Sequence, residues 1–150
     1  MKQPIFFPKW QELPQIDLYL DQVLVYVNHI MAQSLGQAET SLTAAMVNNY
    51  VKQGYLPKPI KKKYNALQLA RLIVITSLKP VFAIQDIWTA IESLNWESEE
   101  LYNSFVACMA EEEGEIPPLI QSACQTLKSY YLTRQILSEL EKENPHESNR

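Results

Sequence analysis

The chain has 150 residues, but it contains little glycine, cysteine or histidine and no long apolar run. Its three glycines lie far apart, which excludes a glycine-rich phosphate loop. Its two cysteines, Cys108 and Cys124, are too few for a disulfide framework and lack the partners of a zinc site, so we expect two core thiols. The apolar runs are shorter than the roughly 18 residues that a membrane helix needs, so no membrane partner is expected.

Candidates for catalysis are also scarce. The two histidines, His29 and His146, have no evident partner for acid–base chemistry. The acidic run at 111–115 lacks the alternating oxygen ligands of a calcium loop and is interpreted as a solvated helix end. We therefore expect a protein that is not an enzyme, with no metal and no cofactor. Pro4 and Pro8 interrupt an N-terminus without an apolar segment, which predicts no signal peptide and a cytoplasmic location.

What the sequence does have is an uneven charge distribution. The formal net charge is −4, but residues 1–80 hold nine basic and four acidic side chains, and residues 81–150 hold four basic and thirteen acidic ones. Between residues 40 and 85 there are seven basic side chains and no acidic one. An ordinary surface mixes both signs, so this window favours an anionic partner.

Apolar spacing predicts an all-α fold with helices over about 15–35, 43–53, 66–79, 84–95, 97–113 and 117–143. Asn28 falls among polar residues opposite the apolar stripe of the first helix. Thr43 is typical of an N-cap, Asn65 followed by Gln68 of a capping box, and Gly54 of a C-cap. The expected organisation is an arm at 1–14 that aromatic side chains pin to the body, a helix-turn-helix domain at 15–95, a two-helix appendage at 96–143 and a frayed tail at 144–150.

Two helices followed by a lysine-rich loop have the order of a helix-turn-helix with a wing. The outward face of the second helix is small and polar, which suits a major groove, and asparagine can read adenine there. Lysines in the loop would bind flanking phosphates. The predicted DNA-binding set is Thr43, Ala44, Ala45, Asn48, Asn49, Lys52, Lys58, Lys61, Lys62, Lys63 and Tyr64.

The segment LTAAMVNNYVKQGYLP (42–57) resembles the start of MerR-type regulators, with Tyr64-Asn65 at the wing-closing position. Together with LYLDQV (18–23), KKKY (61–64) and LKPVFAIQDI (78–87), it is similar to the YkrK-like family of Gram-positive bacterial proteins of unknown function. The resemblance implies a MerR-like winged helix-turn-helix core and no established activity. Where the MerR pattern has arginines on the recognition helix, this chain has Ala45 and Asn48.

Two hypotheses follow. The first is a transcription regulator that binds double-stranded DNA, in which residues 97–143 form a homodimer. Its dimer seam is the coiled-coil-like spacing from Ile116 to Tyr130, which packing within one chain explains equally well. The alternative is a protein-interaction adaptor that kept the fold and lost DNA binding. The missing arginines and the acidic second half favour this alternative.

Overall fold

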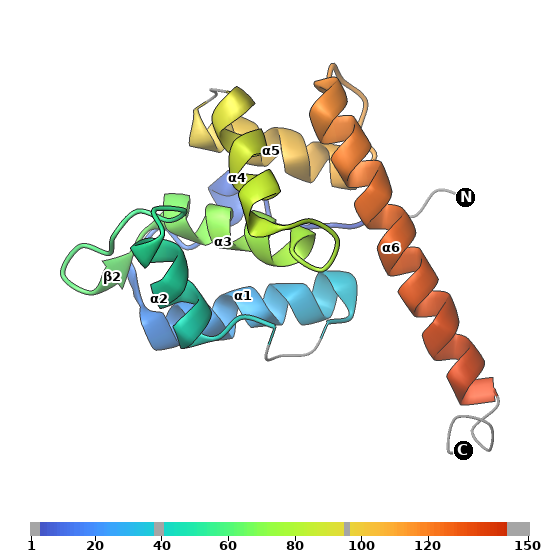
Figure 1. The fold of residues 1–150 in the computed structure, drawn as a ribbon, viewed down its shortest axis with the longest axis horizontal. Helices are drawn as coiled ribbons and strands as arrows, with labels where there is room; N and C mark the ends of the chain where they lie inside the picture. Colours follow the sequence, from blue (N-terminus) through green and yellow to red (C-terminus); the bar gives the residue numbers. More distant parts are fainter. Residues whose placement is uncertain (1–3, 38–40, 95–96, 144–150) are drawn as a thin grey trace.

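The computed structural model describes residues 4–37, 41–94 and 97–143. The protein is mostly helical and has one small antiparallel sheet (Figure 1). In chain order the elements are the 3₁₀ turn η1 (Trp10–Glu12), β1 (Leu18–Tyr19), α1 (Leu20–Leu35), α2 (Ala44–Lys52), β2 (Lys63–Tyr64), α3 (Ala66–Leu78), α4 (Ile84–Leu94), α5 (Ser98–Met109) and α6 (Pro118–Glu143).

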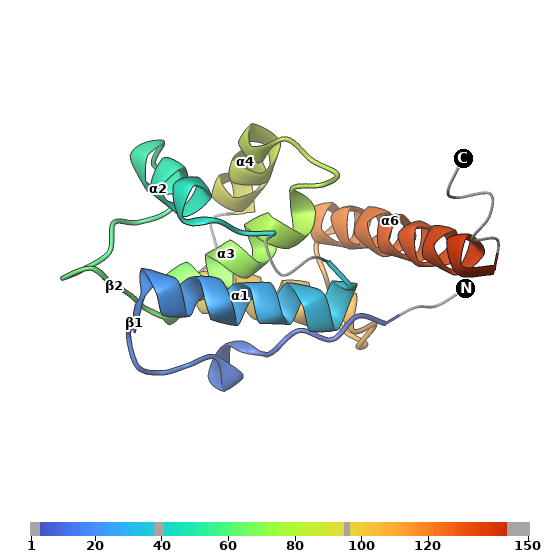
Figure 2. The ribbon, with the colours of Figure 1, turned by 90° about the horizontal axis from the view of Figure 1, so that it is seen from below.

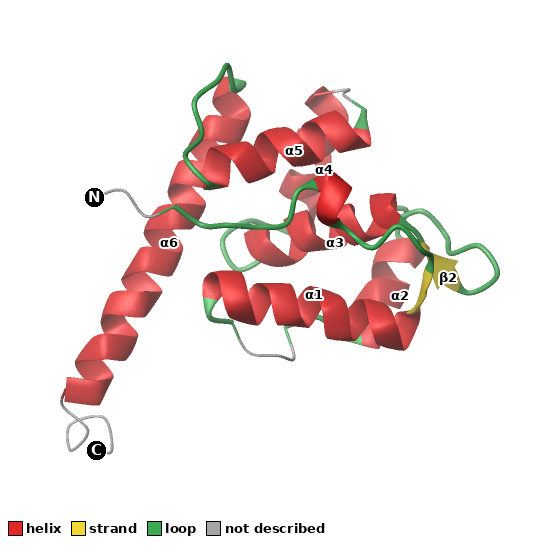
Figure 3. Ribbon diagram, turned by 180° about the vertical axis from the view of Figure 1, so that it is seen from behind, coloured by secondary structure: helices red, strands yellow, loops and turns green. Residues whose placement is uncertain are grey.

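The sheet corrects the all-α prediction. Leu18 pairs with Tyr64 and Tyr19 pairs with Lys63, so the chain before α1 lies beside the chain before α3, as the two yellow strands in Figure 3 show. The first helix begins at Leu20 and not near residue 15, because Tyr19 is extended and its N–H donates to the Gln22 side chain at 2.9 Å. Strands of two residues are too short to show a period-2 pattern.

Most helix ends lie where the sequence predicts them. Thr43 Oγ1 accepts a hydrogen bond from the Met46 N–H at 3.3 Å, and Asn65 and Gln68 form the reciprocal capping box. Gly36 and Gly54 both have the positive φ of C-terminal cap residues. The fifth helix ends at Met109, earlier than predicted, and Glu111 takes a left-handed conformation there.

The core is continuous from the arm to α6. α3 lies at its centre, with Leu69, Leu72 and Ile73 fully buried, and packs against α1 and α5. The arm runs along α5, where Phe7 stacks on Phe105 at 5.7 Å and the Tyr102 hydroxyl donates to the Pro8 carbonyl at 2.6 Å. The expected pinning by aromatic residues therefore holds for Phe7, whereas Phe6 is 69 % exposed.

Only the first half of α6 belongs to this core. Ile120, Cys124 and Leu127 are buried, and α5 packs along this half, so the seam predicted at 116–130 is used within one chain. No described side chain after Tyr131 is buried, and the second half of the helix projects beyond the other elements (Figures 1 and 2). The predicted tail at 144–150 lies outside the described residues. None of the described helices is both long and apolar enough to cross a membrane.

Candidate nucleic-acid interface

The helix α2 presents a small, polar face to solvent. Val47 and Tyr50 are buried on its inner side. The predicted outward set is exposed as expected, namely Thr43, Ala44, Ala45, Asn48, Asn49 and Lys52. Thr43 also caps the helix, so its hydroxyl already has one hydrogen-bond partner. No bulky side chain lies on this face, which leaves the helix backbone free to approach another surface.

A buried asparagine holds the start of α2 in place. Asn28 is 7 % exposed, and both ends of its amide bond to the backbone of Leu42: Nδ2 donates to the carbonyl at 2.9 Å, and Oδ1 accepts from the N–H at 2.8 Å. The prediction that Asn28 belongs to the polar outer face of α1 was wrong. A polar residue beside a buried stripe looks the same in sequence whether it faces solvent or an internal backbone group.

The loop after α2 ends in a tight hairpin. Ile60 and Lys63 exchange both backbone hydrogen bonds, at 3.0 and 2.9 Å, so Lys61 and Lys62 alone form the turn. Their φ angles are +52° and +67°, the left-handed pair that a two-residue hairpin requires. Asn-Gly is the usual sequence at such a turn, because a side chain at positive φ costs energy. Here two lysines occupy both positions.

Buried contacts fix the base of this hairpin. Gln68 is 3 % exposed, and its Nε2 donates to the carbonyls of Pro57 and Lys58 at 2.9 and 3.1 Å. Its Oε1 accepts from the Asn65 N–H at 2.7 Å, so one side chain joins the hairpin to the first turn of α3. The sequence predicted the capping bonds between Asn65 and Gln68, but it did not predict the two bonds from Gln68 to the carbonyls of Pro57 and Lys58. The hairpin is therefore held rigidly at its base and carries its charge at the tip.

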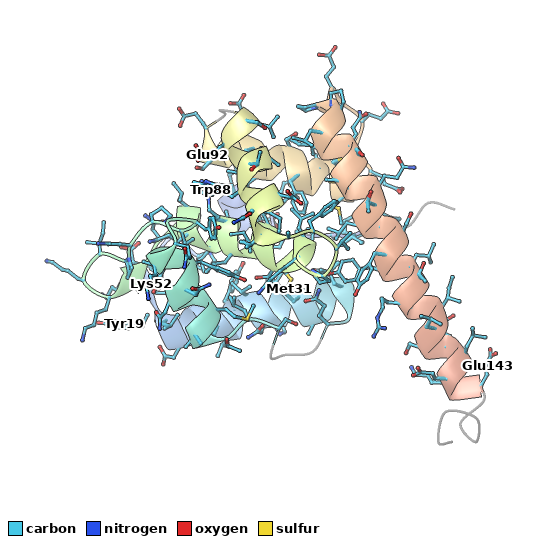
Figure 4. All side chains as sticks on the ribbon, viewed as in Figure 1. Tyr19, Met31, Lys52, Trp88, Glu92 and Glu143 are labelled. Atoms are coloured by element: carbon cyan, nitrogen blue, oxygen red, sulfur yellow. The ribbon has the colours of Figure 1, made fainter. Side chains whose placement is uncertain are left out.

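The lysines of this region differ in their surroundings. Within the described parts of the chain, Lys52, Lys58, Lys61 and Lys62 are exposed and form no ion pair. Lys63 is half-buried, with its Nζ 5.1 Å from the centre of the Tyr19 ring, a cation–π contact. α2 and the hairpin lie at the same end of the molecule (Figures 1 and 2), and Lys52 ends the helix from which the hairpin loop departs (Figure 4).

Tyr64 is not available to a partner. Its side chain is 3 % exposed in the core beside β1, and burial raises its pKa above the ordinary value. Tyr64 lies one residue after Lys63, which closes the hairpin with Ile60, and it is a packing residue that pairs with Leu18. A strand of two residues is too short for the sequence to show which of its side chains faces the core.

The other two cations of the acid-free window lie elsewhere. Arg71 stacks over Trp88 at 5.5 Å, and Trp88 in turn contacts Tyr55 at 5.7 Å, on the side of α3 that faces α4 (Figure 4). Burial lowers the pKa of Arg71, and nearby Glu92 opposes that shift. Lys79 lies at the other end of α3, over the Tyr50 ring at 5.5 Å. The charge excess therefore resolves into five lysines at one end of the molecule and two separate cations.

The described residues contain no group of three or more His, Cys, Asp or Glu side chains placed to hold a metal ion. Cys124 is buried beside Cys108, and burial raises the pKa of its thiol far above the ordinary value. His29 is exposed on α1. The surface that stands out chemically in the described structure is the lysine-bearing end formed by α2 and the hairpin.

Comparison with protein families gives one match, over residues 8–105, to the family described as a domain of unknown function, DUF1836. The match covers the second half of the arm, α1 to α4, the hairpin and most of α5, and this chain belongs to that family. No curated protein and no solved structure matches the chain.

Proposed function

We propose that this protein binds double-stranded DNA, with α2 docked in the major groove and the hairpin at 58–64 on the flanking phosphates, and that it regulates transcription in the cytoplasm of a bacterium. The proposal depends on one observation: Lys61 and Lys62 occupy both left-handed positions of a tight turn whose base is fixed by buried hydrogen bonds. Strained backbone at an exposed, charged tip is typical of a functional site.

The surrounding electrostatics support the same partner. The five lysines on α2 and the hairpin lie in a window without a single acidic residue, and none of them forms an ion pair with a described residue. Phosphate binding by lysines releases counterions and gives affinity that does not depend on sequence. Asn48 and Asn49, exposed on α2, are the side chains that would read base edges.

The arrangement α1, α2, hairpin and α3 supports the finer proposal of a MerR-like winged helix-turn-helix of the YkrK-like kind. β1 pairs with the returning strand of the hairpin, which is how a wing is tied to its domain. The link between α1 and α2 spans residues 36–43, longer than the three or four residues of a simple helix-turn-helix. Through its two bonds to Leu42, Asn28 ties the end of this long link to α1 and so fixes where α2 begins.

The test is fluorescence anisotropy with labelled duplexes of mixed genomic sequence at low salt. The double variant Lys61→Gln/Lys62→Gln should lower the affinity about tenfold or more, because two phosphate contacts are lost. The matched control, Lys9→Gln/Lys142→Gln, removes the same charge from exposed positions on the arm and the end of α6 and should leave the affinity nearly unchanged. Absence of binding by the native protein, or an equal loss in both variants, would refute DNA binding.

The homodimer that forms part of the DNA-binding proposal is supported by the second half of α6. Ile136 and Leu137 are 45 and 47 % exposed on a helix that projects from the body, on turns where no described side chain is buried. We propose that this face, within the predicted dimer region 97–143, pairs two copies, as helix-turn-helix proteins do to read two half-sites. Light scattering should give twice the chain mass for the native protein and the single mass for Ile136→Glu. A single mass for the native protein would exclude the dimer.

A further inference from the structure

An open hollow with a volume of about 570 Å³ lies between the chain that leads into β1 and the outer face of α1. The arm runs alongside α1 before it turns back into β1 (Figure 2). The hollow is lined by residues of two segments, 14–18 and 21–29, on the side of α1 opposite to its buried stripe. The structure describes every residue from 4 to 37, so both segments are complete.

The hollow carries the two most exposed large apolar side chains of the described structure. Ile16 and Val25 are each 73 % exposed, and each of the two segments contributes one of them. Tyr26 adds a half-buried ring to the same lining. Single exposed apolar residues are common on protein surfaces, but apolar side chains gathered in one concavity are typical of an interaction site.

The segment that carries Ile16 is anchored at both ends. Leu13 is 2 % exposed and Leu18 is 8 % exposed, so the chain is buried on either side of the exposed residues. Between them, Gln15 Nε2 donates to the Leu13 carbonyl at 2.7 Å, and Leu18 pairs with Tyr64 in the sheet. Because the backbone is already fixed, a partner that binds here loses little affinity to ordering this segment.

The charge around the hollow is negative. Asp21 lines it, and Asp17 is exposed next to Ile16. Burial raises the pKa of Tyr26 above its ordinary value and nearby Glu12 adds to that rise, so a third carboxylate lies close to the lining. Neither aspartate forms an ion pair with a described residue, and no lysine or arginine belongs to the lining.

These charges determine the kind of partner. Lys63 lies over the neighbouring Tyr19 ring, so three carboxylates outnumber one ammonium group near the hollow. Nucleic acids and anionic lipids would be repelled, whereas lysine or arginine beside an apolar side chain would be attracted. An amphipathic helix of another protein brings both, because its apolar stripe fits a groove and its charged flanks reach the rim.

We propose that this hollow binds a basic amphipathic segment of another protein, which inserts aliphatic side chains between Ile16 and Val25. The lysine or arginine side chains of that segment lie beside Asp17 and Asp21. No residue of α2 or of the hairpin lines the hollow, so this site is separate from the proposed DNA-binding surface. The proposal holds whether or not the chain binds DNA.

NMR titration of the isotopically labelled full chain tests the proposal. The probe is a synthetic amphipathic peptide of about 14 leucine and lysine residues, long enough to form a helix, and its counterpart has glutamate in place of lysine. The lysine peptide should bind saturably and shift the amide signals of residues 14–29 most, and the glutamate peptide should bind at least about tenfold more weakly. Absence of saturable binding, equal affinity of the two peptides, or largest shifts outside residues 14–29 would overturn the proposal.

Two matched pairs of variants separate this site from general attraction to the peptide. Ile16→Ser should weaken binding about tenfold, whereas Ile60→Ser, which removes an isoleucine that is 71 % exposed on the hairpin, should leave it unchanged. Asp21→Asn should weaken binding about threefold. Asp86→Asn removes the same charge from the first turn of α4, as Asp21→Asn does from that of α1, and should have no effect. An equal loss within either pair would contradict the site.

Two further titrations test other occupants of the hollow. Raising the concentration of the native protein alone, or adding vesicles of anionic phospholipid, should leave the signals of residues 14–29 in place. Concentration-dependent shifts there would assign the hollow to a second copy of the chain, and shifts caused by vesicles would assign it to a membrane surface. Either result would overturn binding of a basic protein segment.

Discussion

The hairpin at 58–64 and the second half of α6 both project from the body, at opposite ends of its long axis (Figure 1). The hairpin is fixed at its base by the buried Gln68 and by pairing with β1, and its exposed charges are all positive. The end of α6 has no buried side chain after Tyr131 and mixes charges of both signs with exposed apolar residues. The two projecting segments therefore differ in how they are anchored and in their charge. The hairpin is positioned for a polyanion, whereas the end of α6 suits another apolar surface.

The largest difference is expected along α6 itself. Leu127→Ala should lower the free energy of unfolding by about 2–5 kcal/mol, because the leucine is fully buried against α5. Leu137→Ala, ten residues further along the same helix, should change it by less than about 0.5 kcal/mol. Urea unfolding at low protein concentration measures both. A large loss in Leu137→Ala would mean that the projecting half is packed in solution.

At the opposite end, the buried anchor of α2 should matter more than its surface. Asn28→Ala is expected to cost about 2–3 kcal/mol, since it leaves the N–H and carbonyl of Leu42 without partners. Asn48→Ala is the matched control, because the same side chain is exposed on α2 and should be nearly neutral to stability. Chemical unfolding of both variants checks this, and a similar cost for the two would contradict the buried role of Asn28.

The turn of the hairpin should show the smallest effect on stability, and the effect should be a gain. Lys61→Asn together with Lys62→Gly places the usual pair at the two left-handed positions and should raise the free energy of unfolding by about 1 kcal/mol. The same variant loses two phosphate contacts, so its DNA affinity should fall while its melting temperature rises. A variant that is more stable and binds DNA equally well would show that the two lysines serve no partner there.

Much of the fold could be predicted from the sequence, because local signals determine it. Thr43, Asn65 and the two cap glycines act through neighbours within four residues, and the apolar stripe of α2 points inward as its spacing predicts. The two-residue strands and the bonds of Asn28 could not be predicted, because both depend on contacts between segments distant in sequence.

The predicted binding set also divides into residues placed by local signals and residues placed by contacts between distant segments. Thr43 at the N-cap and the five predicted residues of α2 are exposed as their helical spacing indicates, and Lys58, Lys61 and Lys62 follow on the exposed hairpin. The strand pairing, which the sequence does not reveal, places Tyr64 in the core beside Leu18 and Lys63 against the exposed Tyr19 ring. Whether the exposed set reads DNA stays a prediction.

The dependence of DNA affinity on salt tests the central proposal most directly. If Lys61 and Lys62 each contact a phosphate, the slope of log K against log salt concentration should become shallower by about 1.8 in Lys61→Gln/Lys62→Gln, since each contact contributes about 0.9. The control Lys9→Gln/Lys142→Gln should keep the native slope. A native affinity that does not vary with salt, or identical slopes in all three proteins, would contradict phosphate binding by the hairpin.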